Sequence, residues 1–295
     1  MKIRFWGVRG SIPTPGPNTI KYGGNTTCIE IRTDQNQLII LDGGSGIYML
    51  AQHLAKQMPV EAHIFITHTH WDHIHGLPFF TPLFIPENNI TLYGGFDVVA
   101  GRGIEHAMTT QFQYSYFPVR EAELKAKLKY ETIRAEESIK VGDAIITPTL
   151  MNHPVLNFGY RIESNSKSIF FTGDHEPRFN ILEPEDETYD EYQRMLEEQD
   201  HMLISFVQGV DMLIADSSYT EEEYLTKKGW GHGTFNSSIE LAKKAKAKQL
   251  YFTHHEPTRT DAELESVLDG IKLQNPPSED SVEYHLAMEG IEIEI

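Results

Sequence analysis

The sequence predicts a layered fold that combines β-strands with α-helices, and two observations support this prediction. Short apolar segments rich in β-branched and aromatic residues recur along the chain, and segments with helical periodicity lie between several of them. Four of the apolar segments end abruptly in polar turns that carry histidine or aspartate, namely FITHTH, FFTGDH, LIADSS and YFTHHEP. Because a rigid sheet positions the short loops at its edge, we expect a functional site where these strands end.

The first part of the chain reads as short strands separated by glycine turns. Residues 45–58 have the apolar spacing of a helix, and the apolar segment 63–68 predicts a buried strand that stops where a group of histidines begins. A second helical region is expected at roughly 96–113. The remaining strands expected in this part are 1–7, 26–32 and 37–44.

The second part of the chain also alternates strands with helices. Residues 124–172 predict a run of strands with turns at VGD and SNSK, and residues 282–295 predict a final strand pair. The acidic stretch 183–200 is interpreted as a solvated helix face or a mobile segment, within an insertion around 176–208. The other elements expected here are strands at 210–220 and 249–257 and helices at 220–227, 234–248 and 259–273.

Length, composition and cysteine content narrow the class of protein. The chain has 295 residues, 40% of them hydrophobic, and no proline- or serine-rich linker divides it, so we expect one domain over residues 1–295. We expect no membrane partner, because no apolar run is long enough to span a bilayer and the N-terminal segment lacks the apolar region of a signal peptide. The single cysteine, Cys28, excludes an intramolecular disulfide framework, and together these features favour a cytoplasmic protein.

The formal net charge of −18 bears on the partners of the protein. Proteins that bind long nucleic acids normally present a basic surface that displaces counterions from phosphates, so we expect no long nucleic acid as a partner. A small anionic substrate is compatible with the charge, because bound metal ions can dominate the local field. The sequence leaves the oligomeric state open, with a homodimer as one possibility.

Residues 67–76, THTHWDHIHG, hold four histidines and one aspartate. In an extended segment His68 and His70 lie on the same side, so their imidazoles can bind one cation together, whereas Asp72 and His73 follow a turn and suit a second ion. A structural site closed by several cysteines is excluded, since the chain has only one. Further ligands are available at other strand ends, where Asp174 is suited to bridge two ions. These further candidates are His153, Asp174, and either His254 or His255.

These motifs resemble those of a known family. HTHWDH matches the HxHxDH signature of the metallo-β-lactamase fold, and the later histidines and aspartate stand in the order of that superfamily. The segments GVRGSIPTPGP, YGGNTTCIEI, LDGGSG, GWGHGT and HHEP are similar to the ribonuclease Z-like branch, which includes cyclic-nucleotide phosphodiesterases. The resemblance covers essentially the whole chain. It implies an α+β fold of four layers, an αββα sandwich, with a metal site at one edge of the two sheets.

The resemblance also implies two divalent metal ions, with zinc the first expectation and manganese or iron the alternatives. His254 is preferred to His255 because it follows YFT, where the histidine of the family motif LTH falls. The di-iron relatives have a glutamate where this sequence has His70, so the resemblance does not favour that group. The implied ligands are His68, His70 and His153 for the first ion, Asp72, His73 and His254 for the second, and Asp174 as the bridge.

The expected chemistry is hydrolysis of a phosphodiester by a hydroxide that bridges the two metal ions. Two cations about 3.5–4 Å apart lower the pKa of a bridging water and stabilise both the attacking and the leaving oxygen. Asp72 can also accept a hydrogen bond from the nucleophile. GWGHGT places His232 on a loop where the resemblance implies contact with the scissile phosphate, and Asp216 would keep this imidazole protonated; alternatively, His232 is only a hydrogen bonder at a helix start. We therefore expect a dinuclear phosphodiesterase for a small or cyclic nucleotide.

Two other functions compete with this prediction. One is a hydrolase of a thioester, lactone or other carboxylic ester on the same metal centre, which has less need of His232 and Asp216. The other is a non-catalytic, metal-dependent regulatory module, which would be expected to have lost a ligand. Enzymes that process tRNA 3′ ends carry a long arm between the third histidine motif and the bridging aspartate, whereas only about twenty residues separate His153 from Asp174 here.

Several neighbouring residues receive supporting roles. Asp42 is expected to support the metal-binding loop by hydrogen bonds, and His75 to set that loop or to bond a ligand from behind. Asn152 and His175 adjoin proposed ligands and are assigned the same kind of support. The four aromatic side chains of 111–119 are interpreted as core residues, with stacking on a nucleobase as the alternative.

Overall fold

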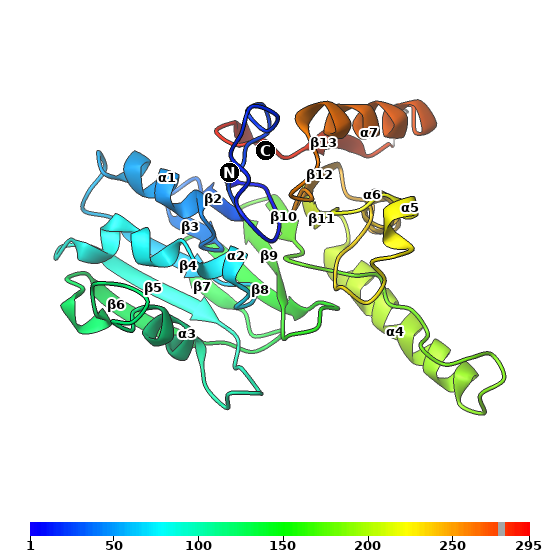
Figure 1. Cartoon of the computed structure of the whole chain (residues 1–295), viewed down its shortest axis with the longest axis horizontal. Helices are drawn as coiled ribbons and strands as arrows, with labels where there is room; N and C mark the ends of the chain where they lie inside the picture. The colour runs from blue at the N-terminus through cyan, green and yellow to red at the C-terminus, as the bar shows by residue number, and fades with distance from the viewer. Residues whose placement is uncertain (277–280) are drawn as a thin grey trace.

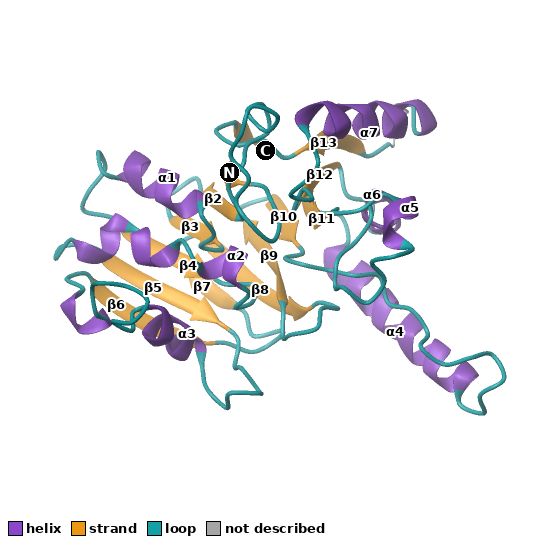
Figure 2. Cartoon of the chain, in the orientation of Figure 1, coloured by secondary structure: helices purple, strands orange, loops and turns teal. Residues whose placement is uncertain are grey.

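The computed structural model describes residues 1–276 and 281–295. Within these residues two mixed seven-stranded sheets face each other, and helices cover their outer faces (Figures 1 and 2). The first sheet has the order β14 (Glu292–Glu294), β1 (Lys2–Gly7), β2 (Cys28–Arg32), β3 (Leu38–Leu41), β4 (Glu61–Phe65), β5 (Asn89–Gly94) and β6 (Lys127–Thr132). The second sheet has the order β13 (Glu283–Leu286), β12 (Gln249–Thr253), β11 (Met212–Asp216), β10 (Lys167–Phe171), β9 (Phe158–Ser164), β8 (Ala144–Leu150) and β7 (Ile139–Val141). The expected αββα architecture is confirmed.

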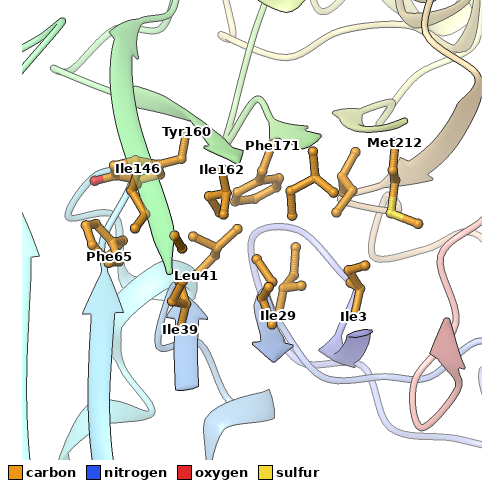
Figure 3. Close-up of a cluster of buried hydrophobic side chains, with 14 of the residues drawn as sticks. Ile3, Ile29, Ile39, Leu41, Phe65, Ile146, Tyr160, Ile162, Phe171 and Met212 are labelled. Atoms are coloured by element: carbon orange, nitrogen blue, oxygen red, sulfur yellow. The ribbon is translucent and has the colours of Figure 1, made fainter. Parts of the chain in front are cut away.

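Three apolar clusters separate the four layers. Successive side chains of a strand point to opposite faces, so in β3 Ile39 and Leu41 enter the cluster between the sheets while Leu38 and Ile40 pack under the helices. Strands buried on both faces read as continuous apolar runs, as LIIL does. Figure 3 shows the cluster between the sheets, where Ile39 and Leu41 face residues of the second sheet such as Ile162. The site is therefore supported by two rigid sheets.

Seven α-helices lie in the described residues. Three of them begin at threonine residues whose hydroxyls accept a backbone N–H of the first turn: Thr220 for α5, Thr234 for α6 and Thr260 for α7. No helix of this part of the chain combines the length and apolar character needed to cross a bilayer. The helices are α1 (Gly46–Leu54), α2 (Trp71–Ile74), α3 (Ile104–Gln111), α4 (Tyr189–Val207), α5 (Glu221–Tyr224), α6 (Phe235–Lys244) and α7 (Asp261–Gln274).

Two expectations for the region between residues 85 and 113 were wrong or incomplete. The helix expected at 96–113 begins only at Ile104, because the Asp97 carboxylate accepts the backbone N–H groups of Val99 and Ala100 and holds a turn there. The strand β5 was not predicted at all. Its sequence, NITLYG, alternates polar and apolar residues over its first four positions and is buried throughout its last three, where it lies between two parallel neighbours.

The acidic stretch 183–200 lies mostly on a helix with a solvated face. It contains the N-terminal part of α4, which projects from the rest of the chain together with the loop before it (Figure 1). Apolar side chains at Leu203 and Val207 tie the C-terminal part of α4 to the second sheet. Of the two interpretations of this stretch, the solvated helix face is the one that fits residues 189–200.

Candidate metal centre and active site

The candidate site lies at the edge of the sheets where parallel strands end. In the first sheet β3 and β4 are parallel, and residues 68–73 follow the C-terminal end of β4. In the second sheet β10, β11 and β12 are parallel, and Asp174, Asp216 and His254 lie at or just after their C-terminal ends. Parallel strands present their carboxyl ends at one edge, which is where layered α/β proteins bind ligands. The topology thus brings residues distant in sequence together.

The side chains predicted as metal ligands come together in two groups. Within each group, the potential ligand atoms lie within 4.8 Å of one another. The Asp174 carboxylate lies between the groups, with Oδ2 3.4 Å from His68 Nε2 and Oδ1 3.2 Å from His73 Nε2. The side chains of each group are therefore close enough to share a metal ion, and their roles as metal ligands stay predictions. The first group is His68, His70, His153 and Asp174, and the second is Asp72, His73 and His254.

Imidazoles from both groups are anchored through Nδ1, which leaves Nε2 facing Asp174. Nδ1 of His73 donates to Asp42 Oδ2 at 2.8 Å, and Nδ1 of His68 lies 3.0 Å from the Thr67 hydroxyl. The supporting hydrogen bonds expected of Asp42 are therefore present. A histidine that binds a metal ion through one nitrogen is typically oriented in this way through the other.

The two histidines from the second sheet follow the same pattern. His153 Nδ1 donates to the Gly231 carbonyl at 2.8 Å, and His254 Nδ1 lies 2.9 Å from the Ser218 hydroxyl. His254 Nε2 is 3.3 Å from both Asp72 Oδ2 and Asp174 Oδ1. His255 instead contacts the Ala287 carbonyl at 3.0 Å and is fully buried, so it is neither in the cluster nor on the surface.

The donor set fits divalent metal ions. In the described part of the chain, the buried atoms His68 Nε2, His73 Nε2 and Asp174 Oδ1 have no hydrogen-bond partner, although they face one another. His153 Nε2 also lies only 3.1 Å from His70 Nδ1. Leaving such buried polar groups unpaired is costly, and cations between them would satisfy all of them. Imidazole and carboxylate donors without a thiolate suit zinc, and also manganese or iron.

The charges of the cluster favour the ligand forms of Asp174 and His68. Burial alone would raise the pKa of Asp174, but the imidazoles of His254 and His73 outweigh burial and hold it well below its usual range. Burial lowers the pKa of His68 far below its usual value, which keeps the ring neutral. An ionised carboxylate beside a neutral imidazole is the pair that a divalent cation requires. Burial alone would lower the pKa of His73 and His254, but Asp174 and other nearby carboxylates outweigh burial and raise it, so these two rings must lose a proton when an ion binds.

His232 lies against the cluster and is held by Asp216. Its Nδ1 donates to Asp216 Oδ2 at 2.9 Å, and its ring stacks on that of His254 with 4.6 Å between the centroids. Burial alone would lower the pKa of His232, but Asp216 and Asp174 raise it to about 9. The residue that caps α6 is Thr234, so His232 does not cap that helix. Its role as a proton donor stays a prediction.

A third possible metal group overlaps the second and contains Asp174, Asp216, His232 and His254. Asp216 is already engaged there: Oδ1 accepts the Ser218 hydroxyl at 2.8 Å, and Oδ2 accepts the His175 backbone N–H at 3.1 Å besides the His232 ring. These bonds leave Asp216 suited to orient His232 and Ser218 rather than to bind an ion.

Glu176 is a supporting residue that the sequence did not reveal. This buried carboxylate accepts hydrogen bonds from the backbone N–H groups of Gly229 and Gly231 at 2.7 and 2.9 Å, and from the Tyr224 hydroxyl at 2.7 Å. It therefore holds the loop that carries His232. A Cβ at Gly231, where φ is +90°, would lie 2.4 Å from His153 Nδ1, so this position requires glycine.

Three other contacts complete the surroundings of the site. The Ser11 backbone N–H donates to Asp72 Oδ2 at 2.7 Å, a contact from distant sequence that no motif predicted. His75 donates from Nδ1 to the Trp71 carbonyl at 2.6 Å. It therefore stabilises the loop of the candidate ligands, which was one of the two roles expected for it. Asn152 donates its backbone N–H to His175 Nδ1 at 3.2 Å, behind the adjacent ligand candidates.

Known proteins with similar sequences cover nearly the whole chain. A profile of the β-lactamase superfamily domain matches residues 38–255, more than half of the chain. Ribonuclease BN of Proteus mirabilis is 23% identical over 311 residues, which cover 92% of this chain and 97% of that protein. Ribonuclease Z of Staphylococcus haemolyticus is 25% identical over 285 residues, which cover 86% of this chain and 88% of the relative.

Solved structures extend the similarity to the fold as a whole. The metallo-β-lactamase fold protein YhfI of Bacillus subtilis superposes with a TM-score of 0.69 at 17% identity, covering 99% of this chain and 98% of that one. A diphosphatase of the PhnP family gives a TM-score of 0.63 at 18% identity, covering 100% of this chain and 97% of that one. The short form of human tRNase Z gives a TM-score of 0.62 at 18% identity, covering 100% of this chain and 99% of that one. Profile and fold agree, and the chain belongs to the β-lactamase superfamily, with the metallo-β-lactamase fold.

Proposed function

We propose that the protein is a dinuclear metal-dependent phosphodiesterase that cleaves a small or cyclic nucleotide phosphodiester. One observation carries the proposal: the buried Asp174 carboxylate lies between two sets of ligand side chains, and an imidazole held by a second carboxylate, His232 on Asp216, lies against the same cluster. A phosphodiester needs both features, since its charge must be neutralised and its alkoxide leaving group needs a proton.

Two divalent ions, once bound, would supply charge neutralisation and a water acidified toward neutrality. Asp72 contributes an oxygen that accepts the Ser11 backbone N–H at 2.7 Å and is thereby fixed toward the cluster, where it can also accept a hydrogen bond from the attacking water. His232 bonds Asp216 through Nδ1, so Nε2 is the nitrogen from which a proton can pass to the leaving oxygen. Zinc is the proposed metal, with manganese and iron as alternatives.

The proposed substrate is small rather than a structured RNA. Relatives of this chain are named ribonucleases and a tRNase, so RNA is the direct competitor. Two observations favour a small substrate. The chain has a net charge of −18, and only the β9–β10 hairpin and its flanking loops lie between His153 and Asp174, where tRNA-processing enzymes carry a long arm. A cytoplasmic location, supported by the single buried cysteine, is part of the proposal, and a homodimer remains a prediction.

A substrate panel tests the proposal. Purified protein loaded with zinc or manganese is assayed on cyclic nucleotides, dinucleotides, a nitrophenyl phosphodiester, a precursor tRNA, a thioester and a lactone. We expect the highest kcat/KM on a nucleotide phosphodiester and little cleavage of the tRNA. A clear preference for the thioester or lactone would make the protein an ester hydrolase. Full metal occupancy without turnover of any substrate would favour a regulatory module.

A further inference from the structure

The insertion around 176–208 forms one wall of a cavity that begins at His153. This cavity, which we call the insertion cavity, has a volume of about 370 Å³ and lies between the loop at Asn152–Pro154 and the N-terminal part of α4. Sites for small molecules generally have volumes of roughly 300–1,000 Å³ and combine apolar walls with a few polar groups. The insertion cavity therefore has the size of a small-molecule site and adjoins a proposed metal ligand.

The walls of the insertion cavity carry groups suited to a flat, polar ring. Phe179 and Tyr192 supply aromatic surfaces, and Met195 adds a flexible apolar one. Among residues 1–276 and 281–295, neither the Tyr192 hydroxyl nor the Gln199 side-chain amide has a hydrogen-bond partner, although both residues line the cavity. A heteroaromatic base would satisfy these groups at its edge while it stacks on the rings.

Cations lie beside this cavity in an otherwise acidic chain. The Arg178 side chain is only 12% exposed and lines the cavity; it binds Asp200 through one nitrogen at 2.9 Å, which leaves other guanidinium donors unused. Lys228 lies over the Phe179 ring, with Nζ 4.0 Å from its centroid. Arg178 and Lys228 thus offer positive charge to an anionic molecule, while Glu176, the carboxylate that lines the cavity, is engaged by the Tyr224 hydroxyl and two backbone N–H groups.

A second cavity, on the other side of the cluster, is less suited to a nucleotide. It has about 320 Å³, adjoins His68 and is lined mainly by apolar side chains, including Val98, Val99 and Leu156. Its one charged lining residue is Asp97, which would repel a phosphate. Phe96 gives the second cavity one aromatic side chain, whereas the insertion cavity has two, Phe179 and Tyr192, together with the cation Arg178.

We propose that the insertion cavity binds the nucleobase of the substrate, with the ring between Phe179 and Tyr192, the base edge at Gln199, and Arg178 toward the sugar and phosphate. This inference rests on the proposed function and assigns a role to the insertion: it makes the enzyme selective for nucleotide diesters over alkyl diesters. Loss of one stacking side chain is expected to weaken base binding about 5- to 150-fold.

Equilibrium binding tests the inference without relying on turnover. Metal-loaded protein is titrated calorimetrically with the four nucleoside 5′-monophosphates and with ribose 5-phosphate, which has the same phosphate but no base. We expect wild type to bind at least one nucleotide more tightly than ribose 5-phosphate. Tyr192→Ala and Phe179→Ala should remove that preference and leave ribose 5-phosphate binding unchanged, while Gln199→Leu, which preserves volume, should change the ranking of the four bases.

Matched controls keep the result interpretable. Tyr116→Ala removes a tyrosine that is 74% exposed and lines neither cavity, and Val99→Ala alters the opposite cavity; both should bind like wild type. Unchanged nucleotide binding in Tyr192→Ala and Gln199→Leu, or a loss at Val99→Ala instead, would overturn the inference. Diester hydrolysis without any base preference would overturn it and leave the proposed function intact, whereas base-selective binding without hydrolysis would overturn the proposed function alone.

Discussion

The two halves of the proposed metal centre differ in how the protein supports them. In the half formed by Asp72, His73 and His254, every side chain is buried and each is bonded from behind, by Ser11, Asp42 and Ser218 respectively. In the half formed by His68, His70 and His153, Thr67 and Gly231 also hold His68 and His153 from behind, but His70 is exposed, and its Nδ1 lies 3.1 Å from His153 Nε2. The buried half thus has side chains fixed in place, as an ion site requires, and the other half is open to solvent at His70.

This difference assigns distinct tasks to the halves. A site whose ligands are fixed by bonds from behind binds its ion tightly, whereas a site with an open side can exchange water for substrate. The insertion cavity adjoins His153, which belongs to the open half, whereas the His232 ring lies 5.5 Å from that of His153 and 4.6 Å from that of His254, and so contacts both halves. We therefore expect an ion in the buried half to be structural as well as catalytic, and an ion in the open half to meet the substrate.

Removing the ligand common to both halves should have the largest effect. Asp174→Ala should lower the metal content of both halves, and activity should fall by more than the roughly 10–100-fold that loss of an outer supporting bond costs. Elemental analysis and kcat/KM on a nucleotide diester measure the two effects. Asp97→Ala, whose carboxylate bonds within its own loop, serves as the control. Two retained equivalents of metal in Asp174→Ala would show that the halves do not share this residue.

Removing His232, the proposed proton donor, should affect only one class of substrate. His232→Ala should keep both metal ions and lose about 10²–10⁴-fold in kcat on a nucleotide diester, whose alkoxide needs a proton. It should retain much of its activity on a nitrophenyl diester, because nitrophenolate leaves without help. Asp216→Asn should show the same pattern more mildly. Equal losses on both substrates would instead make His232 a phosphate-binding residue.

Stepwise chelation should separate the halves. We expect one metal equivalent to leave quickly, from the open half, and the second slowly. Asp42→Ala removes the carboxylate behind His73 and should weaken the slow site roughly 10–100-fold, so that both ions leave at similar rates. Metal content after timed exposure to a chelator measures this. Loss of both ions at one rate from wild type would remove the distinction between the halves.

The smallest effect is expected at the loop behind the open half. Glu176→Gln keeps one acceptor oxygen for the backbone N–H groups of Gly229 and Gly231 but removes a charge. We expect a loss in kcat near the lower end of a roughly 10–100-fold range with metal content unchanged, and a larger loss in Glu176→Ala. Glu183→Gln, an exposed change in the same insertion, is the control. Equal activity of all three variants would contradict a positioning role for Glu176.

Sequence patterns predicted those side chains of the cluster that are local or stand at strand ends. His68, His70, Asp72 and His73 lie in one short loop, and the later candidates follow apolar strands that the sequence marks clearly. The supporting residues were harder to predict, because Ser218 is 36 residues from His254 and Glu176 is 53 residues from Gly229. Such contacts depend on how loops cross the sheet edge, which neither periodicity nor spacing encodes.

The errors in the predicted fold and the cavity that was not predicted each have a structural cause. β5 was missed because its alternation is confined to the four residues NITL, and the helix near residue 100 is delayed by one side chain, Asp97. The insertion was recognised by its acidity, but its cavity depends on where α4 lies relative to His153. Local composition predicted a solvated helix face there and gave no sign of the wall it forms.

Metal stoichiometry tests the central claim most directly. Protein purified without chelators and then equilibrated with excess zinc or manganese should contain two equivalents per chain by elemental analysis, because two groups of ligand atoms lie on either side of Asp174. Phosphodiesterase activity should rise in step with the second equivalent. A stoichiometry that stays at one equivalent under excess metal would contradict the dinuclear centre, and with it the account of the two halves.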